Sequence, residues 1–208
     1  MVVPILATAI TEGDHYMRFW ELSMETDLRR FAVLRKIAVT FAALAACAVL
    51  VVAQGRRTRG DELASKGQID DKAAVQASTE MLIAAPDDKV WRLLSNIDGW
   101  PKWQSAISFA RTTGPLKPGT EFTWTTGGTK IKSRLALVVP NTDLSWTGSA
   151  RGAKAIHVWH LKAVEGGGTL VTTKESMSGF LLGMFYSSKD LAKSQKEWLE
   201  ALKGAAEK

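Results

Sequence analysis

His157 and Glu175 are the residues of this chain whose chemistry could include proton transfer. An imidazole can give or take a proton near neutral pH, and a carboxylate in apolar surroundings can act as a base or orient a polar ligand head. His157 and His160 lie three positions apart in an expected strand, so they point to opposite faces and cannot hold a metal together. We therefore predict His157 and Glu175 as candidate catalytic residues. The alternatives are a hydrogen-bonded histidine in a pocket wall and a salt bridge of Glu175 near a sheet edge.

A second group of side chains could line an apolar binding site. Trp124, Trp146 and Trp159 fall on alternating positions of expected strands, where they could contact a flat or greasy ligand or simply pack in the core. The predicted ligand-binding residues are Phe122, Trp124, Ile131, Ser133, Leu135, Trp146, His157, Trp159, Thr173, Glu175, Trp198 and Leu202.

Other kinds of chemistry have no pattern in the sequence. The glycines at 127–128 and 166–168 lie between expected strands and are typical of hairpin turns, since phosphate loops join a strand to a helix. No nucleophile elbow, carboxylate pair, zinc spacing or nucleotide fingerprint is found, so neither a cofactor nor a metal is predicted. The net charge of +6 is shared equally by the residues before and after position 60, and no dense basic stretch indicates a nucleic-acid partner.

The elements that would position these residues follow residue 77. A strand is expected over 78–84, and Pro86 then opens a helix with apolar residues at helical spacing. Residues 100–103 predict a bend or a short second helix. Alternating apolar and polar residues predict six strands, in which Leu137 shares the face of Ile131, Ser133 and Leu135. These strands cover residues 105–112, 121–126, 130–139, 144–148, 155–164 and 169–177.

The chain ends in an expected amphipathic helix, whose apolar stripe is Leu191, Trp198, Leu199 and Leu202. The element order therefore predicts an α+β fold in which a curved, antiparallel, seven-stranded sheet wraps around this helix.

The segment before this domain is predicted to include a membrane span. Residues 37–53 carry no charge, and 31–53 reach spanning length if Arg35 and Lys36 extend toward the headgroups. We predict a tail over 1–30 (with Met17 or Met24 as a possible true start), an anchor over 31–53, a polar linker over 54–76 and the domain over 77–208. A cleaved secretory signal, a lipoprotein signal ending at Cys47 and a buried helix are the alternatives.

Basic residues flank both ends of this segment, so the positive-inside rule gives a tie. The signal-like layout of the preceding cluster slightly favours an extracytoplasmic domain on a single-pass membrane protein. Cys47 is the sole cysteine, which excludes an intramolecular disulfide and leaves the compartment open.

The domain resembles the SRPBCC, or START-like helix-grip, superfamily, and its polyketide cyclase/dehydrase-like members in particular. The resemblance covers about residues 78–205 and is carried, in this order, by residues 85–91, 100–103, 114–122, 144–146, 157–159, 173–176 and Gly179. It implies a helix-grip fold. Members of the superfamily bind lipids, sterols, polyketides and hormones, and only some are enzymes.

These observations leave three functions open. The first is a membrane-tethered binder or carrier of a hydrophobic small molecule, lipid- or polyketide-like, held in a helix-grip cavity. The second is a polyketide cyclase/aromatase- or dehydratase-type enzyme that uses His157 or Glu175. The third is a non-catalytic interaction module with a filled core. The expected partners are the ligand and, through residues 31–53, a membrane; the oligomeric state is not predicted.

Overall fold

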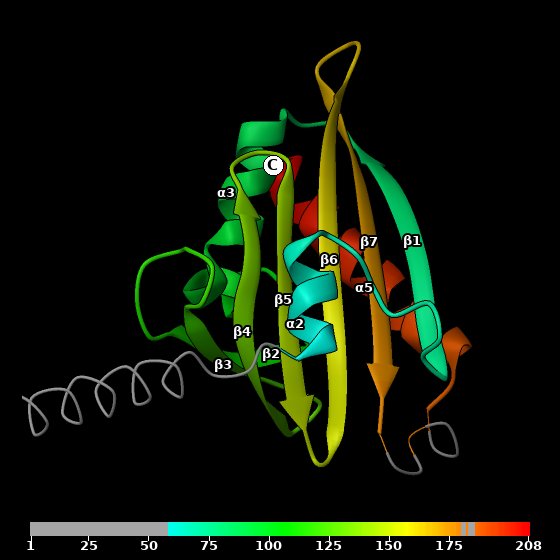
Figure 1. The fold of residues 1–208 in the computed structure, drawn as a ribbon. Helices are drawn as coiled ribbons and strands as arrows, with labels where there is room; N and C mark the ends of the chain where they lie inside the picture. The colour runs from blue at the N-terminus through cyan, green and yellow to red at the C-terminus, as the bar shows by residue number, and fades with distance from the viewer. Residues whose placement is uncertain (1–57, 180–181, 183–185) are drawn as a thin grey trace, which may run out of the picture. The chain divides into compact units, whose positions relative to one another are not determined.

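Seven antiparallel strands form one sheet in the order β1-β7-β6-β5-β4-β3-β2 (Figure 1). β1 pairs with β7, so the first and last strands lie side by side, while the other neighbours are joined by hairpins. The sheet and its strand order along the chain confirm the prediction. The bounds are β1 Val75–Ile83, β2 Ile107–Thr112, β3 Glu121–Thr126, β4 Thr129–Val139, β5 Asp143–Ala150, β6 Ala153–Val164 and β7 Gly168–Ser178.

This computed structural model describes residues 58–179, 182 and 186–208. They belong to one unit of the chain, Arg57–Lys208. The predicted tail over 1–30 and the predicted anchor over 31–53 lie outside the described residues. Within the described ranges, no helix is both long and apolar enough to cross a membrane.

Helix α5 (Ser188–Ala206) packs on the face of the sheet that we call the inner face. A capping box between Ser187 and Asp190 fixes its start, because each satisfies a free group of the other at the first turn. Its buried stripe contains Leu191, Trp198, Leu199 and Leu202, as predicted. Two shorter helices, α3 (Asp87–Ser95) and η1 (Ile97–Lys102), lie beside α5 and β2 respectively.

A bulge in β4 changes the alternation of this strand. The pairing with β5 shifts between Leu135 and Leu137, so Leu137 lies opposite Ser145 and Val138 lies opposite Leu144. Val138 packs against the main core, whereas Leu137 approaches Gly67 on the other face. The prediction that Leu137 faces inward was therefore wrong. The extra residue comes after Ile131, Ser133 and Leu135, so their inward orientation is unaffected.

The predicted linker over 54–76 contains a short helix, α2 (Arg59–Ser65), on the outer face of the sheet. Thr58 and Asp61 form a capping box at its start. Its apolar side, Leu63 and Ala64, packs with Ile156 and Val158, which point outward from β6. The prediction of a linker was therefore wrong for residues 59–65. This helix has little apolar content of its own, but it is stabilised because it buries two β-branched side chains of the sheet.

Hydrogen bonds hold this helix and the residues after it to β5 and β7, in addition to its apolar contact with β6. Ser145 Oγ donates to the carbonyl of Ala64 (2.6 Å), and Thr147 Oγ1 donates to Asp61 (3.0 Å). The backbone N–H of Asp70 donates to Ser176 Oγ (3.0 Å). Residues 58–70 are thus part of the folded domain and form a clamp across β5, β6 and β7.

A fragment that begins at residue 58 should be more stable than one that begins at residue 75. Without α2, the side chains of Ile156 and Val158 lose their cover, which should cost about 3 kcal/mol of unfolding free energy. Urea unfolding of both fragments, followed by circular dichroism, measures the difference. Equal midpoints would mean that the clamp contributes nothing to the fold.

Candidate functional site

Aromatic side chains fill the space between the inner face and α5. Trp198 of α5 lies 5.5 Å from Trp124, 5.6 Å from Trp159 and 6.4 Å from Trp146, measured between ring centroids. Trp100 of η1 closes the cluster with centroid distances of 5.3 Å to Trp198 and 5.6 Å to Trp146. We call these five tryptophans the tryptophan cage. Several of the rings meet edge to face, an arrangement that their quadrupoles favour.

His157 is the polar centre of this cage. Its ring stacks on Trp159 with an interplanar angle of 18° and lies 4.6 Å from the ring of Trp146. Nε2 lies 2.8 Å from Thr173 Oγ1, and Nδ1 lies 3.5 Å from Glu175 Oε2. The sheet register sets this geometry, because His157 pairs with Glu175 across β6 and β7.

Burial removes the charge from both members of this pair at neutral pH. It lowers the pKa of His157 to about 3 and raises the pKa of Glu175 to about 8. A protonated Glu175 can donate toward Nδ1 of a neutral imidazole, which leaves the Nε2 proton to donate to Thr173. Glu175, His157 and Thr173 thus form a row in space of a carboxylic acid, an imidazole and a hydroxyl, surrounded by apolar side chains.

Two indole N–H groups of the cage lack acceptors. Nε1 of Trp159 and Nε1 of Trp198 are buried and have no hydrogen-bond partner among the described residues. By contrast, Nε1 of Trp124 donates to Ser133 Oγ (3.1 Å), and Nε1 of Trp100 donates to the carbonyl of Leu94 (2.9 Å). Buried donors are paired in most proteins, so these two indicate an acceptor other than the residues that the structure describes.

The structure brings the predicted ligand-binding residues together on the inner side of the fold. The set includes ten residues that are almost fully buried, with Glu175 and Ile131 partly buried at its margin: Phe122, Trp124, Ser133, Leu135, Trp146, His157, Trp159, Thr173, Trp198 and Leu202. His160 points outward, as expected, and its Nδ1 lies 2.8 Å from Asp143. Their role in binding stays a prediction.

Sequence reasoning missed Trp100, which is fully buried and contacts Phe122, Trp124, Trp146 and Trp198. The short segment around Pro101 has no clear periodicity, so its pattern did not indicate an inward side chain. The missed signal was residue type, because a tryptophan beside a turn usually has a packing partner.

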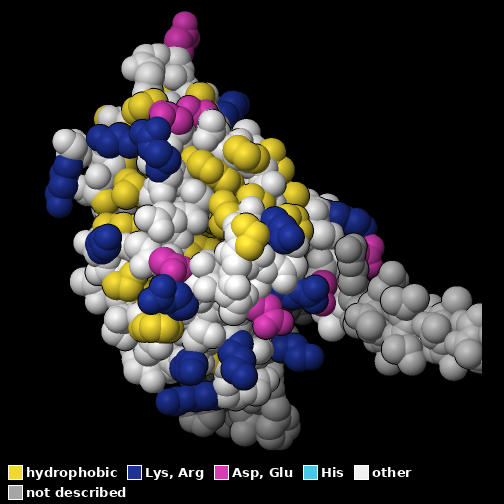
Figure 2. Space-filling view, turned by 90° about the vertical axis from the view of Figure 1, so that its left-hand side faces the viewer, with side chains coloured by type: hydrophobic (Ala, Val, Ile, Leu, Met, Phe, Trp, Pro, Cys, Tyr) yellow, Lys and Arg dark blue, Asp and Glu magenta, His cyan; other side chains and the backbone are white. Residues whose placement is uncertain are grey.

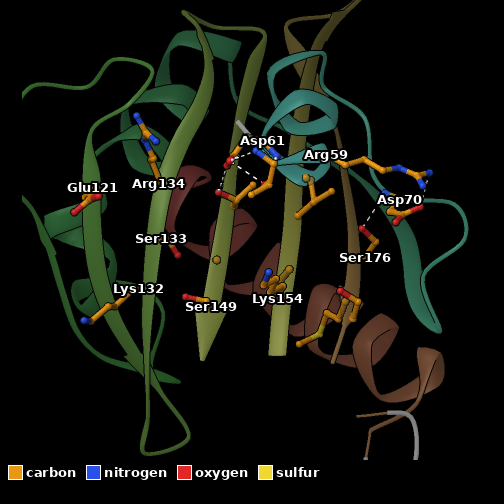
Figure 3. A pocket seen from close by; sticks show the side chains of 18 of the residues that line it. Arg59, Asp61, Asp70, Glu121, Lys132, Ser133, Arg134, Ser149, Lys154 and Ser176 are labelled. Carbon is orange, nitrogen blue, oxygen red and sulfur yellow. Dashed lines mark hydrogen bonds and ion pairs between the residues drawn. The ribbon is translucent and has the colours of Figure 1, made fainter. Parts of the chain in front are cut away.

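A pocket of about 680 Å³ lies on the outer face, beside the start of α2 (Figure 3). Its side chains come from one row of residues that crosses β3 to β7, together with Thr58 to Asp61 and Asp70. The cavity between the inner face and α5 stays a prediction, and the described side chains on the inner side pack closely against one another. We call this outer pocket the groove.

The charges at the upper side of the groove compensate one another. Arg59 pairs with Asp70 (3.4 Å), and Arg134 lies opposite Glu121 in the register of β3 and β4. Burial alone would raise the pKa of Asp61, but hydrogen bonds from Thr58 and Thr147 and the charge of Arg134 hold it below its usual value. Within residues 58–179, 182 and 186–208, no group of His, Cys, Asp or Glu is placed to hold a metal ion.

Comparisons with known proteins agree with this architecture. The profile of a family described as polyketide cyclase / dehydrase and lipid transport matches residues 74–207. No curated protein matches the chain. Among solved structures, a hypothetical protein of Helicobacter pylori is 20% identical with a TM-score of 0.60, over 68% of this chain and 93% of that one.

Two further solved structures share the fold at lower identity. A START superfamily protein from Mycobacterium smegmatis is 14% identical with a TM-score of 0.54, over 64% of this chain and 97% of its own. The Zhui aromatase/cyclase from Streptomyces sp. R1128 is 14% identical with a TM-score of 0.55, over 64% and 93% respectively. At these identities the likeness concerns the fold alone.

Proposed function

This chain belongs to the polyketide cyclase / dehydrase and lipid transport family, and from that premise we propose that it binds or carries a hydrophobic small molecule. The ligand would be lipid- or polyketide-like and would lie between the inner face and α5. Residues 31–53 would tether the domain to a membrane, into which such ligands partition. The proposal concerns binding, since the fold is shared by proteins of different activities.

The unpaired N–H groups of Trp159 and Trp198 carry this proposal. Each is a buried donor with no acceptor among the described residues, and such a donor costs about 1–3 kcal/mol. A largely apolar ligand with one carbonyl or hydroxyl oxygen would remove that cost while its body contacts the surrounding rings. Because the cage is closely packed, we expect Trp198 and α5 to move outward when the ligand enters.

The full chain should therefore retain a hydrophobic compound with an oxygen acceptor through purification in detergent. Mass spectrometry of an organic extract identifies it. The double variant Trp159→Phe/Trp198→Phe keeps both rings and removes both donors, so it should bind that compound about 30-fold more weakly if each hydrogen bond is worth about 1 kcal/mol.

Trp103→Phe is the matched control, since Trp103 is only partly buried at the margin of the main core. It should retain the compound as the unaltered chain does. An extract that contains no bound compound, together with no binding of an environment-sensitive dye, would favour the interaction module with a filled core.

A second candidate function is proton-transfer catalysis on a polyketide-like ligand. The contacts of His157 with Thr173 (2.8 Å) and Glu175 (3.5 Å) favour it, because a neutral imidazole beside a protonated carboxyl can accept one proton and return another. Once the ligand is known, turnover that His157→Gln and Glu175→Gln each abolish, with binding retained, would identify an enzyme. Retained turnover in both variants would exclude this role for the pair.

A further inference from the structure

We propose that the lower end of the outer face, where the β3–β4 and β5–β6 hairpins turn, is a docking surface for anionic phospholipid headgroups. Four cations define this surface, which we call the basic end: Lys130, Lys132, Arg151 and Lys154. The inference rests on the membrane tether of the proposed function for its orientation, and on charge and turn geometry for its chemistry.

The basic end carries uncompensated positive charge. Its four cations line a pocket of about 320 Å³ that has no acidic residue in its wall. All four side chains are exposed, and none forms an ion pair within the part of the chain that the structure describes. Figure 2 shows Lys and Arg side chains gathered in the lowest part of that view. In the groove, by contrast, Arg59 pairs with Asp70, and Arg134 lies opposite Glu121. The uncompensated positive charge is therefore confined to the basic end.

The β5–β6 turn presents one of these cations at a conformational cost. Arg151 has φ 48° and Gly152 has φ 82°, so both turn residues are left-handed, as in a type I′ hairpin. Asn, Asp or Gly is preferred at the first of these positions, and other side chains are strained there. The proposed lipid contact would account for an arginine at this strained position.

Chain connectivity would hold the same face toward the bilayer. Asp61 lines the groove together with Lys132 and Lys154, which also belong to the basic end (Figure 3). Thr58 belongs to the same lining. Four residues, 54–57, separate Thr58 from the end of the predicted anchor at position 53, so the five steps between these two positions span at most about 18 Å. Basic residues near a bilayer surface are attracted by anionic lipids, each contributing about fivefold to association.

Hydrogen exchange of the full chain in nanodiscs tests this proposal. The discs contain either phosphatidylcholine alone or phosphatidylcholine with one quarter phosphatidylglycerol. The backbone amides of the two turns, at 127–130 and 150–154, should exchange several-fold more slowly in the anionic discs. The variant Lys130→Gln/Lys132→Gln/Lys154→Gln should lose this difference.

A matched control removes the same charge from α5, on the other side of the sheet. Lys189→Gln/Lys193→Gln/Lys196→Gln should keep the difference between the two lipids. Equal exchange in both kinds of disc, or loss of the difference in this control, would overturn the proposal. Slower exchange of the same turns with a mixed-sequence RNA in neutral discs would assign the surface to nucleic acid instead.

The proposed membrane anchor and the proposed lipid contact of the basic end can be tested separately. If the full chain does not stay in neutral discs, the proposed tether is wrong, and cosedimentation with phosphatidylglycerol vesicles then decides the lipid proposal alone. Retention of the extracted hydrophobic compound by the triple-glutamine variant at 130, 132 and 154 distinguishes the basic end from the inner binding site.

Discussion

Trp100→Ala should lower the free energy of unfolding by about 4 kcal/mol, because it removes a fully buried indole from the centre of the cage. The variant loses edge-to-face contacts with Phe122, Trp124 and Trp198 at centroid distances of 5.8, 6.0 and 5.3 Å. It also leaves the carbonyl of Leu94 without the N–H that it accepts at 2.9 Å. Urea unfolding monitored by far-UV circular dichroism measures this loss.

Two further variants serve as comparisons for the loss of unfolding free energy in Trp100→Ala. Trp100→Phe keeps an aromatic ring and removes the hydrogen bond to Leu94, so it should cost less than the alanine variant. Phe109→Ala removes a ring that is 45% exposed, and its effect should be small. A loss at Trp100→Ala no greater than that of Phe109→Ala would mean that η1 does not share a core with α5 and the sheet.

The contribution of His157 and Glu175 to stability should be constant between about pH 4.5 and 6.5 and fall on either side. The pKa of Glu175 rises from 4.5 to about 8 on folding, so its contribution is complete below pH 4.5 and is lost as the pH rises toward 8. The pKa of His157 falls from 6.5 to about 3, so its contribution is complete above pH 6.5 and is lost as the pH falls. Between these limits the two slopes cancel.

The alkaline side gives the cleaner measurement, since other carboxylates also titrate in acid. From pH 6.5 to 8.5 the unaltered chain should lose about 2 kcal/mol that Glu175→Gln does not lose. Glu165→Gln, in the exposed β6–β7 turn, is the control and should follow the unaltered chain. Parallel curves for the unaltered chain and Glu175→Gln over this range would contradict a protonated Glu175 in the folded state.

The alternation of apolar and polar residues was enough to predict the sheet and most of the inner face. Phe122, Trp146 and Trp159 lie inward because a strand repeats every two residues, and no bulge precedes the site residues of β4. The stripe of α5 followed in the same way from its helical period. These patterns are local, so they could be read without knowing which strands are neighbours.

The features that were missed depend on contacts between distant segments. Helix α2 has little apolar content of its own and is stabilised by Ile156 and Val158, almost a hundred positions later. The bulge after Leu135 adds one residue to β4 without a marker in the sequence. The contact between His157 and Glu175 depends on the register of β6 and β7, which alternation within one strand does not specify.

The pairing of β1 with β7 has a consequence for how the domain forms during synthesis. Each β1 residue has its partner about a hundred positions later in the chain, as in Val75 with Met177 and Ile83 with Thr169. While the ribosome is still making the middle of the chain, β1 has no neighbour and the hairpins from β2 to β6 can form without it. Completion of the sheet must therefore wait until β7 has left the exit tunnel. Until then, the unpaired edges of β1 stay accessible to chaperones.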